Sequence, residues 1–263
     1  MSERIRKAFS ARRPALVTYL MGGDPDLATS LDLAVACAWG GADLIELGMP
    51  FSDPIADGPV IQRASERALK SGTTVAGVLE LAAQLRQQVP NMPVALMGYL
   101  NPVLAMGLDE FLRRCAAAGV DAVILPDLPV EESAEFRALA RKHGVGTVFL
   151  IAPTSTPARA QAALDASTAF AYFVSVTGVT GARAALPEET AARLDALRRP
   201  SGPPVVVGFG VSSAEQVRAL GAHADGVVVG SAIVSRIAEP GADQERRERV
   251  AAFVHSLRSS PTP

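Results

Sequence analysis

Short apolar runs alternate with longer amphipathic segments along most of the chain. The runs are rich in Val, Ile and Leu, and they predict eight strands at residues 15–21, 43–48, 93–99, 122–127, 146–152, 169–176, 204–208 and 226–230. Apolar content without polar alternation is typical of parallel strands, which are buried on both faces. The segments between them have helical spacing, as at 26–39, 75–88, 109–118, 131–142, 187–198 and 214–220.

Repeated strand–helix units form either an open doubly wound sheet or a closed barrel. Eight units in a chain of 263 residues favour the α/β class and a (β/α)8 TIM barrel. No composition break divides the chain, so we expect one domain over residues 1–263. Ile5 and Phe9 predict an extra N-terminal helix within residues 1–13, a last helix is expected at 243–257, and residues 259–263 are expected to fray.

Composition narrows the class of protein. The net charge of −2 argues against a nucleic acid or an anionic membrane as the main partner. No apolar run approaches the roughly 20 residues of a membrane span. Cys37 and Cys115 lie far apart inside apolar helical segments, which fits neither a disulfide framework nor a zinc site. We therefore expect a reduced, cytoplasmic protein.

The second strand and the loop after it carry the strongest candidate chemistry. In such barrels the active site lies at the carboxyl ends of the strands. Glu46 lies near that end of an apolar strand, and Asp57 lies in a stiff, acidic loop that follows it. Burial would raise the pKa of Glu46 and let it act as a general acid and then a base. A structural alternative is a Glu46–Arg ion pair and an Asp57 that only shapes a turn.

The loops after strands seven and eight are rich in glycine. They contain Gly210 and Gly230-Ser231, and the second loop opens a short helix. Backbone N–H groups in such loops bind phosphate in many barrels, although glycines can also serve tight turns alone. The loop after strand six, residues 177–187, has two further glycines and is predicted to be either a flap over the ligand or a flexible connector.

The remaining strand ends offer an apolar lining. No Lys falls at a strand end for a Schiff base, the three His lie on or near helices, and no Cys or Ser occupies a nucleophile elbow. The inward candidates suit a flat aromatic group, with hydroxyls added by Tyr19 and Tyr99: they are Met97, Ile124, Leu150, Tyr172 and Phe209.

The stretch from Glu46 to Pro59 resembles the signature of tryptophan synthase α chains. It reads Glu-Leu-Gly-x-Pro-Phe-Ser-Asp-Pro-x-Ala-Asp-Gly-Pro, a long and specific match. Shorter matches follow other strands, and the resemblance covers residues 4–256. They are Gly23-Asp24-Pro25, Tyr99-x-Asn-Pro, Asp127-Leu-Pro-x-Glu-Glu, Thr177-Gly-Val-Thr-Gly, Gly208-Phe-Gly and Gly230-Ser-Ala-Ile. Tyr19 departs from the Phe common among relatives, which affects the expected pocket shape.

The resemblance implies cleavage of indole-3-glycerol phosphate to indole and glyceraldehyde 3-phosphate. It implies that Glu46 is the acid–base group and that Asp57 stabilises the charge on the indole nitrogen. It also implies a substrate pocket of Tyr172, Phe209, Met97, Ile124, Leu150 and Tyr99, a hydrogen bond from Thr180 to Asp57, and a phosphate site of Gly181, Gly210, Gly230 and Ser231.

The resemblance further implies a partner. This is a pyridoxal-phosphate-bearing β chain in an α2β2 tetramer, whereas the α chain itself carries no cofactor. The expected contacts run from Pro50 to Pro54 and from Pro102 to Leu108. Two other functions remain open at this stage. One is a weakly catalytic barrel that serves as a docking subunit. The other is a phosphosugar isomerase, although this chain lacks the acidic residues or Cys that such an enzyme would have at the ends of strands one or five.

Overall fold

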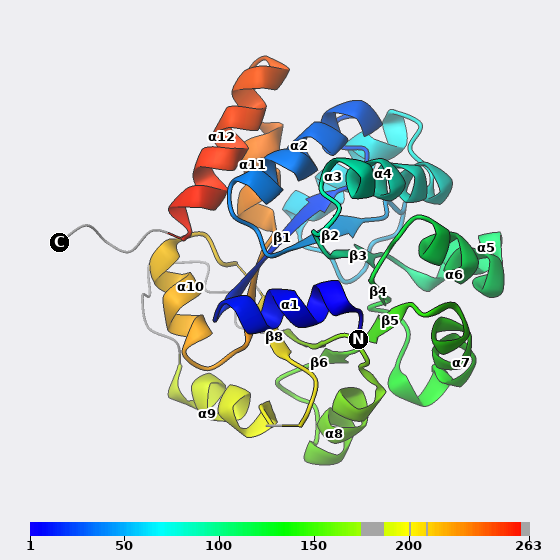
Figure 1. Cartoon of the computed structure of the whole chain (residues 1–263), viewed down its shortest axis with the longest axis vertical. Helices are drawn as coiled ribbons and strands as arrows, with labels where there is room; N and C mark the ends of the chain where they lie inside the picture. The colour runs from blue at the N-terminus through cyan, green and yellow to red at the C-terminus, as the bar shows by residue number, and fades with distance from the viewer. Residues whose placement is uncertain (175–186, 200, 209, 259–263) are drawn as a thin grey trace.

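A computed structural model describes residues 1–174, 187–199, 201–208 and 210–258 (Figure 1). All strands pair in parallel in the order β5-β4-β3-β2-β1-β9-β8-β7-β6. Their bounds are β1 Ala15–Met21, β2 Leu44–Gly48, β3 Val94–Met97, β4 Ala122–Ile124, β5 Gly146–Val148, β6 Leu150–Ile151, β7 Ala171–Val174, β8 Val205–Gly208 and β9 Gly226–Val229.

The sheet closes into a barrel because its two ends belong to one stretch of chain. β5 and β6 are separated by Phe149 alone, and they pair with β4 and β7 respectively. The Phe149 N–H donates to Ser167 Oγ at 3.1 Å, whereas its carbonyl accepts from Tyr172 N at 3.0 Å. The predicted barrel is confirmed. The expectation of one unbroken strand at 146–152 is wrong, because a side chain takes the N–H of Phe149.

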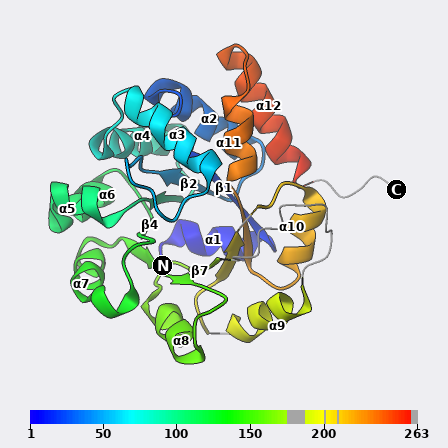
Figure 2. The same ribbon diagram turned by 180° about the vertical axis from the view of Figure 1, so that it is seen from behind.

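Helices surround the strands, most of them as an outer ring and the first of them across one end of the barrel (Figures 1 and 2). They are α1 Glu3–Ala11, α2 Leu27–Trp39, α3 Pro59–Lys70, α4 Val75–Gln88, α5 Leu100–Met106, α6 Leu108–Ala117, the 3₁₀ helix η1 Val130–Glu132, α7 Ala134–His143, α8 Pro157–Ala166, α9 Glu188–Leu197, α10 Ala214–Gly221, α11 Ser231–Ala238 and α12 Asp243–Ser256. Among the described residues, none of these helices has the length and apolar content to cross a membrane.

Two apolar cores hold the fold together. One lies between the strands and the outer helices, and the other fills the barrel interior. The predicted N-terminal helix is confirmed as α1, which crosses the amino end of the barrel (Figure 1). Its Ile5 and Phe9 are buried in the interior core, with the Phe9 and Phe170 rings 5.7 Å apart. α1 therefore covers the amino end of the barrel, opposite the carboxyl ends of the strands where the candidate residues lie.

Candidate active site

Glu46 is a buried carboxyl group without a polar partner. Its neighbours Ile45 and Leu47 pack in the outer core, so the alternation of β2 turns Glu46 toward the barrel interior. Its exposed fraction is 0%, and neither Oε1 nor Oε2 has a hydrogen-bond partner in the described part of the chain. No arginine in the described part of the chain pairs with Glu46, which contradicts the alternative of an ion pair there. A buried polar group left unpaired is costly, which makes this position a candidate for function.

The pKa values of Glu46 and Asp57 are both raised in the folded protein. Burial, and then the charge of Asp57, raise the pKa of Glu46 to about 8. Burial also raises the pKa of Asp57 to about 6, against the lowering effect of a hydrogen bond with Tyr99. At neutral pH Glu46 thus holds its proton while Asp57 is ionised. Two carboxyl groups with separated pKa values form an acid and a counter-charge in one site.

The loop that carries Asp57 is anchored at several points. The N–H of Phe51 donates to Ser65 Oγ at 2.9 Å, and that hydroxyl donates to the Phe51 carbonyl at 2.8 Å. Ala56 N donates to Tyr99 Oη at 3.0 Å. α3 starts directly after Asp57, with Gly58 as its cap and Pro59 in its first turn. These bonds hold Asp57 over the carboxyl end of β2.

All three tyrosines of the chain lie around the two carboxyl groups. Tyr19 pairs in register with Glu46, and Tyr172 lies on β7. Burial first, and then the charges of Glu46 and Asp57, raise the pKa of both phenols. Tyr99, next to Asp57, also has a raised pKa because of burial and then the Asp57 charge. The tyrosines therefore stay protonated and can donate hydrogen bonds near neutral pH.

Two glycines make room for these phenols. A Cβ at Gly208 would lie 2.7 Å from Tyr172 Oη, and one at Gly48 would collide with Tyr19 Oη. Since real Cβ atoms do not approach so closely, both positions require glycine for the tyrosines to face the interior. The sequence indicated Gly48 and Gly208 as strand ends and motif residues, without this reason.

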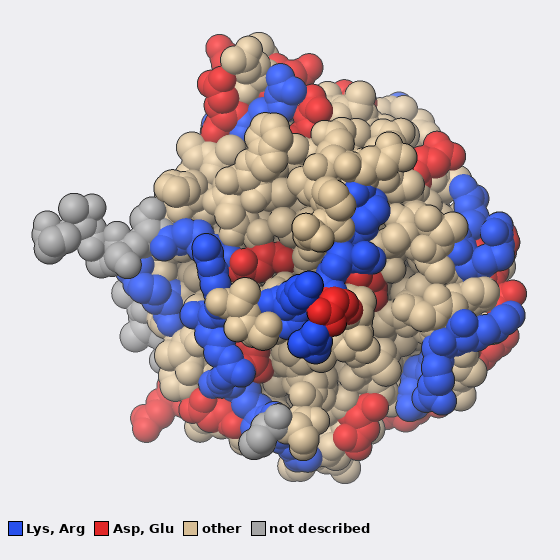
Figure 3. Space-filling model, viewed as in Figure 1, with Lys and Arg blue, Asp and Glu red and all other residues tan. Residues whose placement is uncertain are grey.

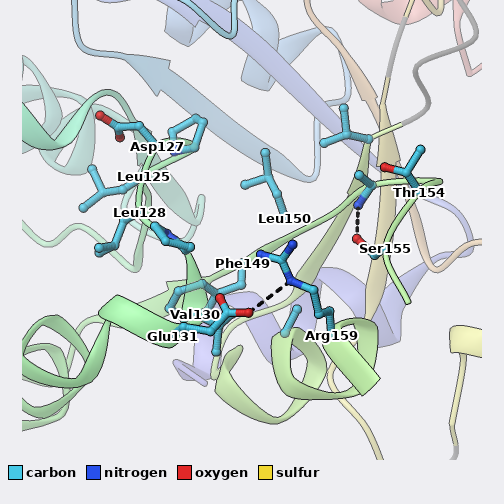
Figure 4. Close-up of a pocket in the computed structure, with 15 residues that line it drawn as sticks. Leu125, Asp127, Leu128, Val130, Glu131, Phe149, Leu150, Thr154, Ser155 and Arg159 are labelled. Carbon is cyan, nitrogen blue, oxygen red and sulfur yellow. Dashed lines mark hydrogen bonds and ion pairs between the residues drawn. The ribbon is translucent and has the colours of Figure 1, made fainter. Parts of the chain in front are cut away.

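The predicted apolar lining is brought together inside the barrel. Ile124 and Tyr172 belong to the interior core, and Met97 and Leu150 pack against it. Leu150 also lines a pocket of about 480 Å3 between the loops after β4 and β6, where Arg159 pairs with Glu131 at 3.0 Å (Figure 4). Among the described residues, neither Glu46 nor Asp57 lines that pocket, so it is distinct from the immediate surroundings of the carboxyl pair.

The predicted phosphate loops are described only in part. Gly230 precedes α11, and Ser231 is its first residue. A Cβ on Gly230 would lie 3.3 Å from Tyr19 Cβ, so this loop adjoins the tyrosine that pairs with Glu46. Gly210 is exposed. Thr180, Gly181 and Phe209 lie outside the described residues, as do residues 177–186 of the predicted flap and the last two residues of the strand predicted at 169–176.

Sequence reasoning missed several supporting residues. Asp127 accepts from Leu100 N through both carboxylate oxygens at 3.0 Å, which connects the loop after β4 to the helix that follows Tyr99. Arg67 on α3 forms two 2.7 Å hydrogen bonds with the buried Asp24. Asp24 and Asp127 each follow a strand and lie within a motif that resembles the family. This position is the sequence signal that could have identified them. In the described residues no group of three His, Cys, Asp or Glu could hold a metal ion.

Comparisons with known proteins agree with this geometry. A family model described as "Tryptophan synthase alpha chain" matches residues 5–260. The α chain of Geobacter sulfurreducens is 48% identical over 248 residues, covering 94% of this chain and 93% of the relative. That of Laribacter hongkongensis is 46% identical over 260 residues, covering 99% and 98%.

Solved structures are also similar. The alpha subunit from Legionella pneumophila has a TM-score of 0.87 at 34% identity, covering 98% of each chain. A chain from the tryptophan synthase α2β2 complex of Pyrococcus furiosus has a TM-score of 0.87 at 40% identity, covering 94% of this chain and 98% of that one.

Proposed function

The chain belongs to the tryptophan synthase alpha chain family, and on that premise we propose that Glu46 and Asp57 carry out its reaction from two sides of one indole ring. The protein is a carbon–carbon lyase that cleaves indole-3-glycerol phosphate to indole and glyceraldehyde 3-phosphate in tryptophan biosynthesis. The family needs no cofactor for this step, because pyridoxal phosphate belongs to the β chain.

The observation that carries the assignment is the unpaired, fully buried Glu46 next to Asp57. Protonated Glu46 delivers its proton to C3 of the indole ring, and ionised Asp57 takes the proton from the ring nitrogen. Carboxylate Glu46 then removes the proton from the glycerol hydroxyl that adjoins the ring. The bond from the ring to the glycerol chain breaks, its electron pair enters the ring, and Asp57 returns its proton to nitrogen. Both groups end in their starting states.

The apolar lining supplies the rest of the site. Met97, Ile124 and Leu150 bind the flat ring, and Tyr172 and Phe209 help form the pocket. Tyr99 holds Asp57 through its hydroxyl. Thr180 donates to Asp57 when the substrate is bound, and the phosphate is held by Gly181, Gly210, Gly230 and Ser231.

A β chain is the proposed partner, in an α2β2 assembly. The loop from Pro50 to Pro54 and the helical segment from Pro102 to Leu108 are its proposed contacts. Ile55 and Leu104 support this surface, because they are 84% and 54% exposed although large and apolar. We also propose a cytoplasmic location, since both cysteines are free and buried.

Replacement of the acid–base group tests the function. We expect Glu46→Gln to bind indole-3-glycerol phosphate but release no indole, because an amide cannot supply or accept the proton. Glu80→Gln is the matched control, since Glu80 is exposed on α4. Indole release by purified Glu46→Gln at the wild-type rate would contradict the assignment.

A further inference from the structure

A second pocket lies at the opposite end of the barrel from the carboxyl pair. It has a volume of about 330 Å3 and is lined by Phe9, Arg13, Arg198, Arg199, Gly202, Pro203, Pro204 and Asp225. These residues come from α1, from the end of α9, and from the segments that precede β1, β8 and β9. β1, β9 and β8 are neighbours in the barrel, so one pocket spans three adjacent strand starts.

The pocket holds more positive than negative charge. Its three guanidinium groups face a single carboxylate, Asp225. Asp225 Oδ2 accepts from Val205 N at 2.9 Å, and Oδ1 is shared between Arg198 at 3.3 Å and Arg13 at 3.6 Å. The exposed guanidinium of Arg199 makes no hydrogen bond or ion pair within the described part of the chain. The charged residues that line the pocket therefore carry a net charge of about +2, whereas the whole protein carries −2.

The positive surroundings extend beyond the pocket. Figure 3 shows Lys and Arg side chains gathered on this face around α1 and over α9 and α10. Burial, and then the nearby charge of Arg12, lower the pKa of Arg258 to about 10. Arg258 is ion-paired with Asp43, so its own charge is largely offset. Arg12 precedes Arg13 of the pocket, and its charge adds to that of the three lining arginines.

We propose that this pocket binds a small dianion carrying a phosphate group, at a site separate from the catalytic one. A phosphate dianion matches the excess charge, and guanidinium groups bind phosphate oxygens through two parallel N–H donors. The volume lies within the range of small-ligand sites. Phe9 and the two prolines give the pocket an apolar wall against which the carbon part of a phosphate ester can pack.

Binding here would connect two parts of the chain. Arg13 precedes β1, whereas Arg198 and Arg199 follow α9 and precede β8. A bound anion would hold these segments together and stabilise the folded state by mass action, since the unfolded chain has no such cluster.

The test is calorimetric titration with inorganic phosphate, followed by glycerol 3-phosphate, in a phosphate-free buffer of low ionic strength. Gly230→Asp serves as the background, because it disables the proposed catalytic phosphate site. On that background we expect binding to persist, and to weaken about tenfold or more in Arg199→Gln and Arg13→Gln through loss of a charge-assisted hydrogen bond. Tighter binding of one probe identifies free phosphate or an ester as the ligand.

Arg113→Gln is the matched control. Arg113 is exposed on α6 and pairs with Glu110, remote from the pocket. We expect it to bind both anions as the parent does, and we expect Arg199→Gln to release indole at the wild-type rate. The proposal is overturned if no phosphate binding survives Gly230→Asp, or if Arg113→Gln weakens it as much as Arg199→Gln. Neither result bears on Glu46, so the two proposals fail independently.

Discussion

Replacing Glu46 by Gln should stabilise the fold while it removes the activity. The folded protein raises the pKa of Glu46 from 4.5 to about 8. Below the unfolded pKa the carboxyl is protonated in both states, so its ionisation costs nothing. As the pH rises through that value, the unfolded chain releases a proton that the folded chain keeps, and stability falls until the folded pKa is reached.

The size of the effect follows from the shift. Each pKa unit corresponds to roughly 1.4 kcal/mol, so the cost is about 1 kcal/mol at pH 5, about 3 kcal/mol at pH 7 and about 5 kcal/mol above pH 8. Solvent screening does not reduce this free-energy cost, because Glu46 is fully buried. The amide of Gln has a similar shape and cannot ionise. The gain in the free energy of unfolding should therefore follow the same course with pH.

Urea unfolding followed by circular dichroism measures this gain. Wild type, Glu46→Gln and the exposed control Glu80→Gln are compared at about pH 5, 7 and 8.5, where the slopes with urea should agree. We expect the difference for Glu46→Gln to grow with pH and that for Glu80→Gln to stay near zero. A difference independent of pH, or a loss of stability at the highest pH, would refute the reasoning.

The remaining predictions concern activity and binding. Asp57→Asn should lower indole release by about 10²-fold through loss of one electrostatic stabiliser, and a change below about threefold would contradict that role. The kcat/KM of the wild type should fall below about pH 6, as Asp57 is protonated, and above about pH 8, as Glu46 ionises; a flat profile over this range would be inconsistent with the pair. Gly230→Asp should weaken glycerol phosphate binding at the catalytic site, measured as competition with indole-3-glycerol phosphate, by charge repulsion, whereas unchanged competition would place the catalytic phosphate site elsewhere. Ile55→Asp should weaken β-chain binding more than Trp39→Asp, an equally exposed apolar position at the other end of the barrel; equal effects would argue against the proposed surface.

The strands were predictable because a strand that is buried on both faces has an unbroken run of apolar residues in the sequence. β1 and the predicted segment coincide at residues 15–21, and the other strand positions are shifted or shortened by a few residues. The interruption at Phe149 was not predictable, since it depends on Ser167, which is distant in sequence.

Three helices have weaker hydrophobic patterns in the sequence. α3 fully buries only Ala64, Ser65 and Ala68, with Val60 and Ile61 partly buried against the interior core, and α8 buries mainly alanines. α5 has seven residues and buries Val103 alone. Burial of small side chains stabilises a helix without the periodicity that sequence reasoning detects.

The site was predictable in its residues more than in its environment. Position near a strand end selected Glu46, and the long loop selected Asp57. The absence of a partner for the Glu46 oxygens among the described residues could not be predicted from the sequence, because it depends on which side chains the nine separate strands turn into the interior. The arrangement of the three tyrosines also required the register of β1 against β2.

Direct titration of the Glu46 carboxyl tests the central claim most directly. Carbon-13 NMR of glutamate carboxyl groups, with the Glu46 signal assigned by its loss in Glu46→Gln, reports its ionisation in the free protein. We expect a pKa of about 8 in the wild type and a lower value, still above 4.5, in Asp57→Asn, where burial remains but the neighbouring charge is gone. A wild-type pKa near 4.5, or one that Asp57→Asn leaves unchanged, would contradict a proton-carrying glutamate coupled to that aspartate.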